Sequence, residues 1–363
     1  MSDLAPMAPP GAAPDRTRIT AAVRAAWNAA LGTRAKDPDK SIIDMNVGAG
    51  RVTRLLDAIE AATGMALPIT IVFQAPTCAA LTDIVLSGKV PSPEPLVVLK
   101  PGDASPPLFI VPGIGATVFE LFDMGKKITC PGVVYAVQPH GPDGLPPNRT
   151  IPTQADFVAS ILRTRLPQGP YRLMGYSFGG LVALEAARRL RATGGNVEFI
   201  GLLDTTAPEP FWSTRTRLEF LLKRLRLHAR ELKGKGFAAV AAHLFGHLAP
   251  MLRRLRRMGG GGGAEDISKS PFHMAGLPPA LGEVRDINIA AFNAYKMAFY
   301  DSRVTLFRSA DGDPLSCDPL RIWPHWVRDL DVRHVPGAHE TMMRGRHAGV
   351  LATAISAALA ALG

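Results

Sequence analysis

Hydrophobic residues along this chain recur with two spacings, which predict two kinds of secondary structure. A recurrence every three or four residues is typical of a helix with one apolar face. Such a repeat runs from Leu181 to Leu190, and Gly194-Gly195 then ends the predicted helix. Short continuous apolar runs bounded by turn residues are typical of buried strands. The runs predict strands at 108–111, 171–174, 197–203, 304–308 and 331–336.

The first quarter of the chain has the helical spacing alone. Residues 19–31 form an amphipathic repeat, apolar positions from Val52 to Ile59 predict a second helix that ends at Gly64, and residues 78–86 predict a third. We therefore expect a small all-α unit here, followed by a Pro-rich linker. The expected division is a disordered N-terminus at 1–16, a helical domain at 17–90, a linker at 91–107 and a larger domain at 108–363.

Neither end of the chain carries a predicted export signal or membrane span. Met1–Pro14 lack the charged-then-apolar pattern of a signal sequence, so we do not expect export. The longest apolar run, Ala348–Leu362, is alanine-rich and shorter than a membrane span, so it predicts a closing helix on the sheet. Cys78, Cys130 and Cys317 lie far apart without metal-binding spacing, which favours a reducing cytoplasm over a disulfide scaffold.

The most informative motif is a serine between two glycines, Gly175-Tyr176-Ser177-Phe178-Gly179. It follows the strand predicted at 171–174 and opens the helix that runs to Leu190. A serine at such a strand-to-helix turn is typical of the nucleophile elbow of α/β-hydrolases. The turn is so tight that glycine two residues to either side relieves crowding. An ordinary glycine-rich turn is the alternative, and the flanking strand and helix favour the nucleophile.

A nucleophilic serine needs a base, and the base needs a carboxylate that orients it. In α/β-hydrolases both follow the serine, acid first. Asp204 ends the strand predicted at 197–203, at the edge where ligands bind in open α/β sheets. His339 lies on the loop after the last predicted strand and is the expected base. His334 alternates within that strand, so we expect it to be structural.

Two other aspartates compete for the role of the acid. Asp311 and Asp313 follow the strand predicted at 304–308, where many hydrolases of this class carry the acid. The same Asp-Gly-Asp-Pro sequence is also typical of a simple turn. We prefer Asp204 because it ends its strand directly, and the alternative stays open at this point.

An acyl transfer also needs amides that stabilise the negative oxygen of the tetrahedral intermediate. One donor is expected from the backbone N–H of Phe178, directly after the nucleophile, and the other from the loop after an early strand. Pro112–Gly115 form that loop, and glycine lets the backbone approach an oxyanion closely. Gly113 is the expected second donor, with its neighbour Ile114 as the alternative.

At this point a family resemblance is clear. Residues 106–362 resemble the thioesterase domains that end nonribosomal peptide and polyketide synthases, and the stretches that carry the resemblance are 134–139, 169–173, 202–204, 318–323 and 336–339. The resemblance implies an α/β-hydrolase sheet with a helical lid at about 206–288 and a triad of Ser177, Asp204 and His339. It also implies cleavage of an acyl thioester on a phosphopantetheine arm, through an acyl-serine intermediate.

The helical domain resembles an acyl or peptidyl carrier. The stretches that carry this resemblance are 42–55, 67–68 and 73–77. Carriers hold phosphopantetheine on the serine of an Asp-Leu-Gly-Gly-x-Ser-Leu motif; aligned on Asp44, this chain has Ala49 at that place, and Asn46, Val47 and Gly50 depart as well. Alanine has no hydroxyl, so the arm cannot be attached. We interpret the domain as a degenerate carrier that docks or spaces, with an engineered Ser→Ala change as the alternative, and expect another protein's carrier to deliver the substrate.

The positive charge of the chain is concentrated in the expected lid. Residues 211–263 hold twelve Lys or Arg and two Glu, so their net charge of +10 equals that of the whole chain. Three explanations stay open: a solvated helix face, a dock for an acidic carrier and its phosphate, or weak attraction to an anionic surface. Aromatic residues are sparse near the arginines, so no nucleic-acid partner is expected.

The sequence therefore predicts a serine hydrolase in secondary-metabolite biosynthesis. No phosphate-binding glycine loop, nucleotide fingerprint or zinc cluster stands in the sequence, so we expect no cofactor and no metal. The expected reaction is release of an acyl or peptidyl chain by hydrolysis or by cyclisation. The alternatives are a stand-alone esterase, lipase or acyltransferase, and a non-catalytic interaction protein with a misassembled triad.

Overall fold

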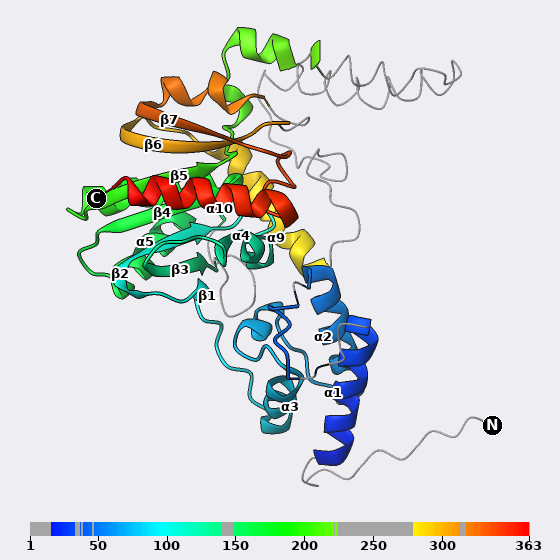
Figure 1. Ribbon diagram of the computed structural model, residues 1–363. Coiled ribbons are helices and arrows are strands. Elements are labelled where there is room, and N and C mark those ends of the chain that lie inside the picture. The colour runs from blue at the N-terminus through cyan, green and yellow to red at the C-terminus, as the bar shows by residue number, and fades with distance from the viewer. Residues whose placement is uncertain are drawn as a thin grey trace, which may run out of the picture.

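The structure is a computed structural model, and it describes most of the chain. The described residues are 16–32, 37, 39–45, 47–138, 149–220, 222–223, 279–312 and 317–362. They form a small helical unit and a larger unit built on a sheet (Figure 1).

The helical unit contains the three helices predicted from the apolar spacing. They are α1 (Arg16–Leu31), α2 (Ala49–Thr63) and α3 (Cys78–Ser87), with a short 3-10 helix η2 (Ile69–Phe73) before α3. Trp27, Leu55 and Leu81 come from three different helices and are fully buried in one common core. Helix α2 ends as predicted, because Gly64 takes a left-handed conformation with φ 76° that glycine adopts without strain.

The larger unit is an α/β sheet, which confirms the predicted fold class. Within the described residues the sheet has seven strands in the order β1-β3-β2-β4-β5-β6-β7. Strand β1 runs antiparallel to β3, and the other neighbouring pairs are parallel. The strands are β1 (Leu96–Lys100), β2 (Asp103–Val111), β3 (Gly132–Val137), β4 (Tyr171–Tyr176), β5 (Val197–Leu203), β6 (Tyr300–Ser309) and β7 (Val327–Val335).

The expected linker at 91–107 is shorter than the sequence suggested. Residues 96–100 form the edge strand β1, and β2 already begins at Asp103. Val97 and Leu99 alternate with more exposed neighbours and are buried against the sheet. The proline content of the region hid this alternation, since an edge strand tolerates nearby prolines that a central strand excludes.

Helices cover both faces of the sheet. Helices α5 (Ile151–Arg165) and α6 (Phe178–Ala192) pack into one hydrophobic core, and α10 (Gly345–Ala360) packs into a second. Helix α10 is the closing helix predicted from the alanine-rich run and crosses one face of the sheet in Figure 1. The remaining described helices near the site are η3 (Val118–Leu121), α4 (Phe122–Gly125) and α9 (Pro279–Ala294).

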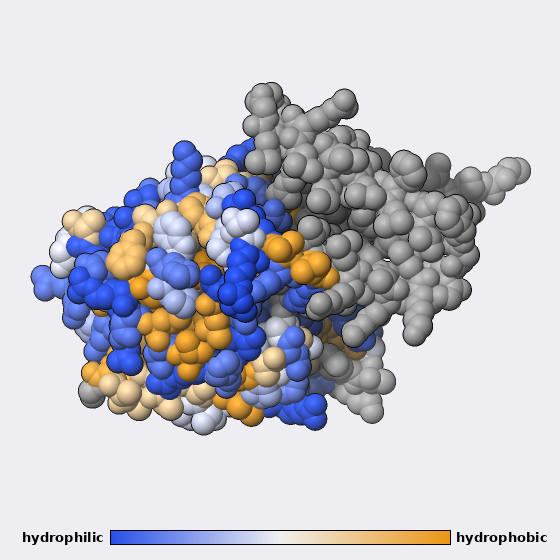
Figure 2. All heavy atoms as spheres, turned by 90° about the horizontal axis from the view of Figure 1, so that it is seen from above, coloured by the Kyte–Doolittle hydropathy of each residue, from blue (hydrophilic) through white to orange (hydrophobic). Residues whose placement is uncertain are grey.

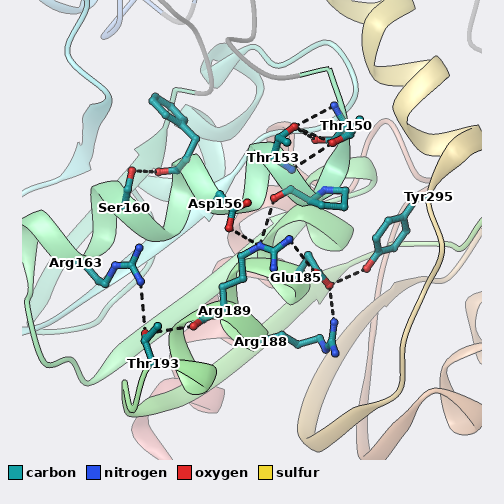
Figure 3. Close-up of polar contacts among 12 residues, drawn as sticks. Thr150, Thr153, Asp156, Ser160, Arg163, Glu185, Arg188, Arg189, Thr193 and Tyr295 are labelled. Carbon is teal, nitrogen blue, oxygen red and sulfur yellow. Dashed lines mark hydrogen bonds and ion pairs between the residues drawn. The ribbon is translucent and has the colours of Figure 1, made fainter.

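A buried carboxylate fastens the helix that follows the nucleophile to its neighbours (Figure 3). Glu185 of α6 accepts a hydrogen bond from the hydroxyl of Tyr295, just beyond α9, and pairs with Arg188 and Arg189. Arg189 also reaches Asp156 on α5. These contacts join α5, α6 and the end of α9, so the helix behind the candidate nucleophile is held from two sides.

In the coloured part of Figure 2, hydrophilic residues lie beside clusters of hydrophobic ones. Among the helices in the described parts of the chain, none has the length and the apolar composition needed to cross a bilayer.

Candidate active site

Ser177 stands on a sharp turn between β4 and α6. Its backbone has φ 52° and ψ −119°, a conformation that non-glycine residues rarely adopt. A Cβ atom on Gly175 would collide with the carbonyl of Gly179, and one on Gly179 would collide with the carbonyl of Pro112. The two glycines are therefore required by backbone-to-backbone contact, as expected for a nucleophile elbow.

The structure brings the three predicted triad side chains together. The Nε2 atom of His339 lies 3.2 Å from Oγ of Ser177, and its Nδ1 atom lies 2.9 Å from Oδ2 of Asp204. These residues follow β7, β4 and β5, whose carboxyl ends meet at one edge of the sheet because the strands are parallel. The chain separates Ser177 from His339 by 162 residues, so only the fold makes them neighbours.

Asp204 is held as a buried anion. Its side chain is 2% exposed and accepts hydrogen bonds from the backbone N–H and the hydroxyl of Ser309, at 3.1 and 2.7 Å. Burial by itself raises the pKa of a carboxyl group, but the bonds from His339 and Ser309 outweigh it and leave the pKa of Asp204 below its ordinary value. Asp204 is thus ionised at neutral pH and oriented from two sides.

The competing aspartates occupy other positions. Asp311 is exposed on the turn after β6, and its backbone N–H donates to the carbonyl of Gly337. Asp313 lies outside the described residues. His334 lies within β7 with an exposed side chain, and His339 is the histidine that reaches Ser177. It is the carboxylate of Asp204 that pairs with Nδ1 of His339.

A tyrosine that the sequence did not single out positions the imidazole. The ring of Tyr176 stacks on that of His339 at 4.9 Å between centroids, and its hydroxyl donates to the His339 carbonyl at 3.0 Å. Burial raises the pKa of Tyr176, so the hydroxyl remains a donor at neutral pH. Because Tyr176 directly precedes Ser177, the strand that carries the candidate nucleophile also holds the candidate base, His339.

The two predicted oxyanion amides differ in their surroundings. Phe178 opens α6, where the first amides of a helix lack intrahelical partners and the helix dipole favours a negative group. The N–H of Gly113 instead donates to Oε1 of Glu120 at 3.0 Å. Burial raises the pKa of Glu120 to about 7, although the Gly113 amide, Arg344 and His339 oppose the rise.

The expected lid is only partly described. Residues 221 and 224–278, which carry most of the basic segment, lie outside the described residues. Helix α9 contributes Asn288, whose side-chain amide donates to the carbonyl of Ile114, within the predicted oxyanion loop. The loop that presents Gly113 is therefore tied to α9 as well as to Glu120.

Ala49, which stands where a carrier has its phosphopantetheine serine, is the first residue of α2. It follows the exposed Gly48, and its own side chain is half-buried. The described residues contain no group of three or more His, Cys, Asp or Glu side chains that could hold a metal ion.

Sequence reasoning missed three residues of the site, and each for a physical reason. Ser309 contacts Asp204 from a strand distant in sequence, and Glu120 contacts Gly113 from a short helix whose packing the sequence does not reveal. Isolated serine and glutamate residues carry no motif. Tyr176 lies inside the elbow motif but at its variable position, where the sequence alone does not reveal which way the ring turns. Of the three, only Ser309 could have been suspected from the sequence. It ends β6, the strand after which many hydrolases carry the acid of the triad.

The mostly parallel sheet, with a serine on a sharp strand-to-helix turn, defines the α/β-hydrolase class. A model of the thioesterase domain family matches residues 106–359, well over half of the chain, so this protein belongs to the thioesterase family. Membership implies hydrolase activity. A model of the phosphopantetheine attachment site matches residues 21–85, which confirms the resemblance of the helical domain to a carrier.

The curated relatives are synthases and synthetases much longer than this chain. The indigoidine synthase of Dickeya dadantii (strain 3937) is 30% identical over 189 residues, which cover 52% of this chain and 13% of the relative. The vanchrobactin synthetase VabF of Vibrio anguillarum is 36% identical over 107 residues, which cover 29% of this chain and 4% of the relative. This chain thus spans a small part of the length of either protein.

One solved structure has a similar fold. It is holo-AB3403, a four-domain nonribosomal peptide synthetase bound to AMP and glycine. The superposition has a TM-score of 0.54 at 20% identity, and covers 99% of this chain and 27% of that chain. At this identity the likeness establishes the fold alone.

Proposed function

We propose that this chain releases an acyl or peptidyl group from a phosphopantetheine carrier through an acyl intermediate on Ser177. The observation that carries the proposal is the hydrogen-bonded series from Ser177 through His339 to the buried Asp204. Membership of the thioesterase family supports a thioester as the substrate class. The carrier-like domain and the synthetase relatives support nonribosomal peptide or polyketide-type biosynthesis as the setting.

Acylation follows from the tautomer that Asp204 selects. Its carboxylate accepts the Nδ1–H of His339, which leaves Nε2 unprotonated beside the Ser177 hydroxyl. His339 takes the hydroxyl proton as Oγ attacks the thioester carbonyl carbon. The carbon–sulfur bond then breaks, and the proton passes from Nε2 to the departing pantetheine sulfur. Asp204 stays ionised and stabilises the transient imidazolium.

Deacylation uses the same base a second time. Water, or an amine or hydroxyl of the bound chain, gives a proton to Nε2 of His339 and attacks the acyl ester. The bond between the acyl carbon and Oγ breaks, and the proton returns to Ser177. Water yields a free acid, whereas an internal nucleophile yields a macrocycle.

The amides of Phe178 and Gly113 are proposed to hold the oxyanion in both steps. Phe178 supplies an amide from the positive end of α6. The Gly113 amide becomes available only when the side chain of Glu120 leaves it, since that carboxyl accepts its hydrogen in this structure.

The substrate is proposed to arrive on another protein's carrier. Ala49 provides no hydroxyl for the phosphopantetheine arm, so the chain's own carrier-like domain cannot deliver an acyl group. The basic segment at 211–263 is proposed to meet the acidic carrier electrostatically. A reducing cytoplasm is the proposed location, in keeping with Cys78, Cys130 and Cys317, which are all described and unpaired.

The test combines a serine-directed probe with a thioester substrate. A fluorophosphonate should label wild-type protein but not Ser177→Ala, whereas Ser160→Ala, an exposed serine on α5, should label normally. Hydrolysis of an acyl-pantetheine thioester should fall by about 10⁴-fold or more in Ser177→Ala and in His339→Ala. Labelling that survives in Ser177→Ala would overturn the proposal. Equal rates on a matched oxygen ester would favour the esterase alternative.

A further inference from the structure

One half-buried carboxyl group beside the triad, that of Glu120, donates and accepts no proton in the proposed reaction. Glu120 belongs to η3, and its Oε1 accepts the N–H of Gly113 at 3.0 Å. Gly113 is also packed against the neighbouring ring, because a Cβ there would lie 2.8 Å from Cδ1 of Tyr176 and 3.2 Å from Oε1 of Glu120. The carboxyl thus fills the space directly over the amide.

An amide in this position serves one negative partner at a time. A carboxylate and a developing oxyanion both seek the same N–H, and their like charges repel each other at close range. The side chain of Glu120 is half-buried, and desolvation raises its pKa to about 7 against the opposing effects of Gly113, Arg344 and His339. Its presence therefore competes with the oxygen that the reaction must stabilise.

The same 3-10 helix carries the contact to the carrier-like domain. Phe119, the residue before Glu120, packs against Phe73 at the end of η2, with ring centroids 4.9 Å apart. Phe122, at the start of α4, stacks on the same Phe73 ring at 5.8 Å. Phe119 joins the core of the helical domain, while Phe73 and Ile43 pack against the core of the sheet. The consecutive residues Phe119 and Glu120 thus make different contacts: Phe119 packs on the carrier-like domain, and Glu120 accepts the Gly113 amide.

We propose that the carrier-like domain, through Phe73, holds η3 where Glu120 blocks the Gly113 amide, so that its docking closes the oxyanion site. The inference rests on the proposed function, because it takes Gly113 as an oxyanion donor. A carrier-like domain that lacks the attachment serine carries no cargo, and this contact gives it an autoinhibitory role. Release of Phe73 frees η3 to move and withdraws Glu120 from the amide.

The experiment is a double-mutant cycle on the full chain. The second-order rate of labelling by a fluorophosphonate is measured for wild type, Glu120→Ala, Phe73→Ala and the double variant. Ile84→Ala is the matched control, since Ile84 packs on the carrier-like core from α3. Glu120→Ala should label about tenfold to a hundredfold faster, the range that a hydrogen bond to a charged group represents. Phe73→Ala should also label faster, and Ile84→Ala should match wild type.

If Phe73 acts through Glu120, the effects of the two substitutions on the labelling rate will not be additive. The double variant should be no faster than Glu120→Ala, because both changes free the same amide. An unchanged or slower rate in Glu120→Ala overturns the inference, and so do additive effects in the double variant. If Glu120→Ala does not fold, the Gly113 amide resonance in ¹⁵N-labelled Phe73→Ala decides: an upfield shift supports the inference, and an unchanged shift overturns it. Absence of Ser177-dependent labelling in every variant would instead mean that the proposed function fails.

Discussion

Removing the hydroxyl of Ser309 tests whether its hydrogen bond keeps Asp204 ionised and in place. The hydroxyl donates to Oδ2 of Asp204 at 2.7 Å, and the carboxylate is almost completely buried. A hydrogen bond to a charged group contributes about 1.5–3 kcal/mol. Its loss in Ser309→Ala should therefore raise the pKa of Asp204 above its value in the wild type. The backbone bond from residue 309 to Oδ1 remains in the variant.

The direction of the pH effect follows from the lowered pKa of Asp204 in the folded chain. Its contribution to stability is present above the unfolded-state pKa, near 3.8, and is lost as the pH falls through the folded-state value. Because Ser309→Ala raises the folded-state pKa, this contribution shrinks and the midpoint of acid unfolding moves to higher pH. A less firmly held carboxylate also orients His339 less well, and kcat/KM should fall by about tenfold.

The assay is acid unfolding followed by circular dichroism, together with kcat/KM on an acyl-pantetheine thioester. Ser302→Ala is the matched control, because Ser302 lies on the same strand and its hydroxyl only accepts from Arg191 near the surface. Ser302→Ala should change the free energy of unfolding by no more than about 0.5 kcal/mol. If Ser309→Ala behaves like Ser302→Ala in both measurements, the reasoning about Asp204 is refuted.

Two further predictions concern packing and a second carboxyl group. Gly180→Ala, on α6, should lower the free energy of unfolding by about 1–3 kcal/mol in urea, since its Cβ would overlap Oγ1 of the buried Thr205. Gly349 lies on α10 with open space around it, so Gly349→Ala should raise the free energy of unfolding by about 0.5–1 kcal/mol. Equal changes in the two variants would contradict the predicted overlap at Gly180. For Glu120, the folded-state pKa of about 7 exceeds the ordinary 4.5, so the folded chain binds more protons and loses stability as the pH rises between these values. The stability of Glu120→Gln relative to wild type should therefore increase from pH 5 to pH 8, by on the order of 1–3 kcal/mol, and a difference that stays constant with pH would show that the pKa of Glu120 is not raised in the folded chain.

The sequence was informative wherever chemistry and local backbone geometry coincide. The glycines around Ser177 predicted a strained turn, and the structure supplies the backbone contacts that require them. Apolar runs located the central parallel strands, because a strand covered on both faces must be apolar throughout. Helix ends such as Gly64 were predictable for the same local reason.

Other features depended on contacts between distant residues. The edge strand β1 was missed because only its pairing with β3 makes it a strand. Asp204 and Asp311 both follow strands, and only the register of β5 and β6 brings one of them to Nδ1 of His339. The contact of Glu120 with Gly113 spans seven residues but depends on how η3 packs, so no motif announces it.

The sequence by itself determined which chemistry is present: a serine on a sharp turn, a later aspartate and histidine, and a carrier-like domain with alanine in place of its serine. The tertiary structure decided which groups meet, namely Ser309 on Asp204, Tyr176 on His339 and the Glu120 carboxyl on the proposed oxyanion amide. The physical reason is the separation along the chain of the residues that interact. Backbone conformation and apolar periodicity are set by neighbouring residues, whereas hydrogen bonds between buried groups depend on the closure of long chain segments, which no local pattern encodes.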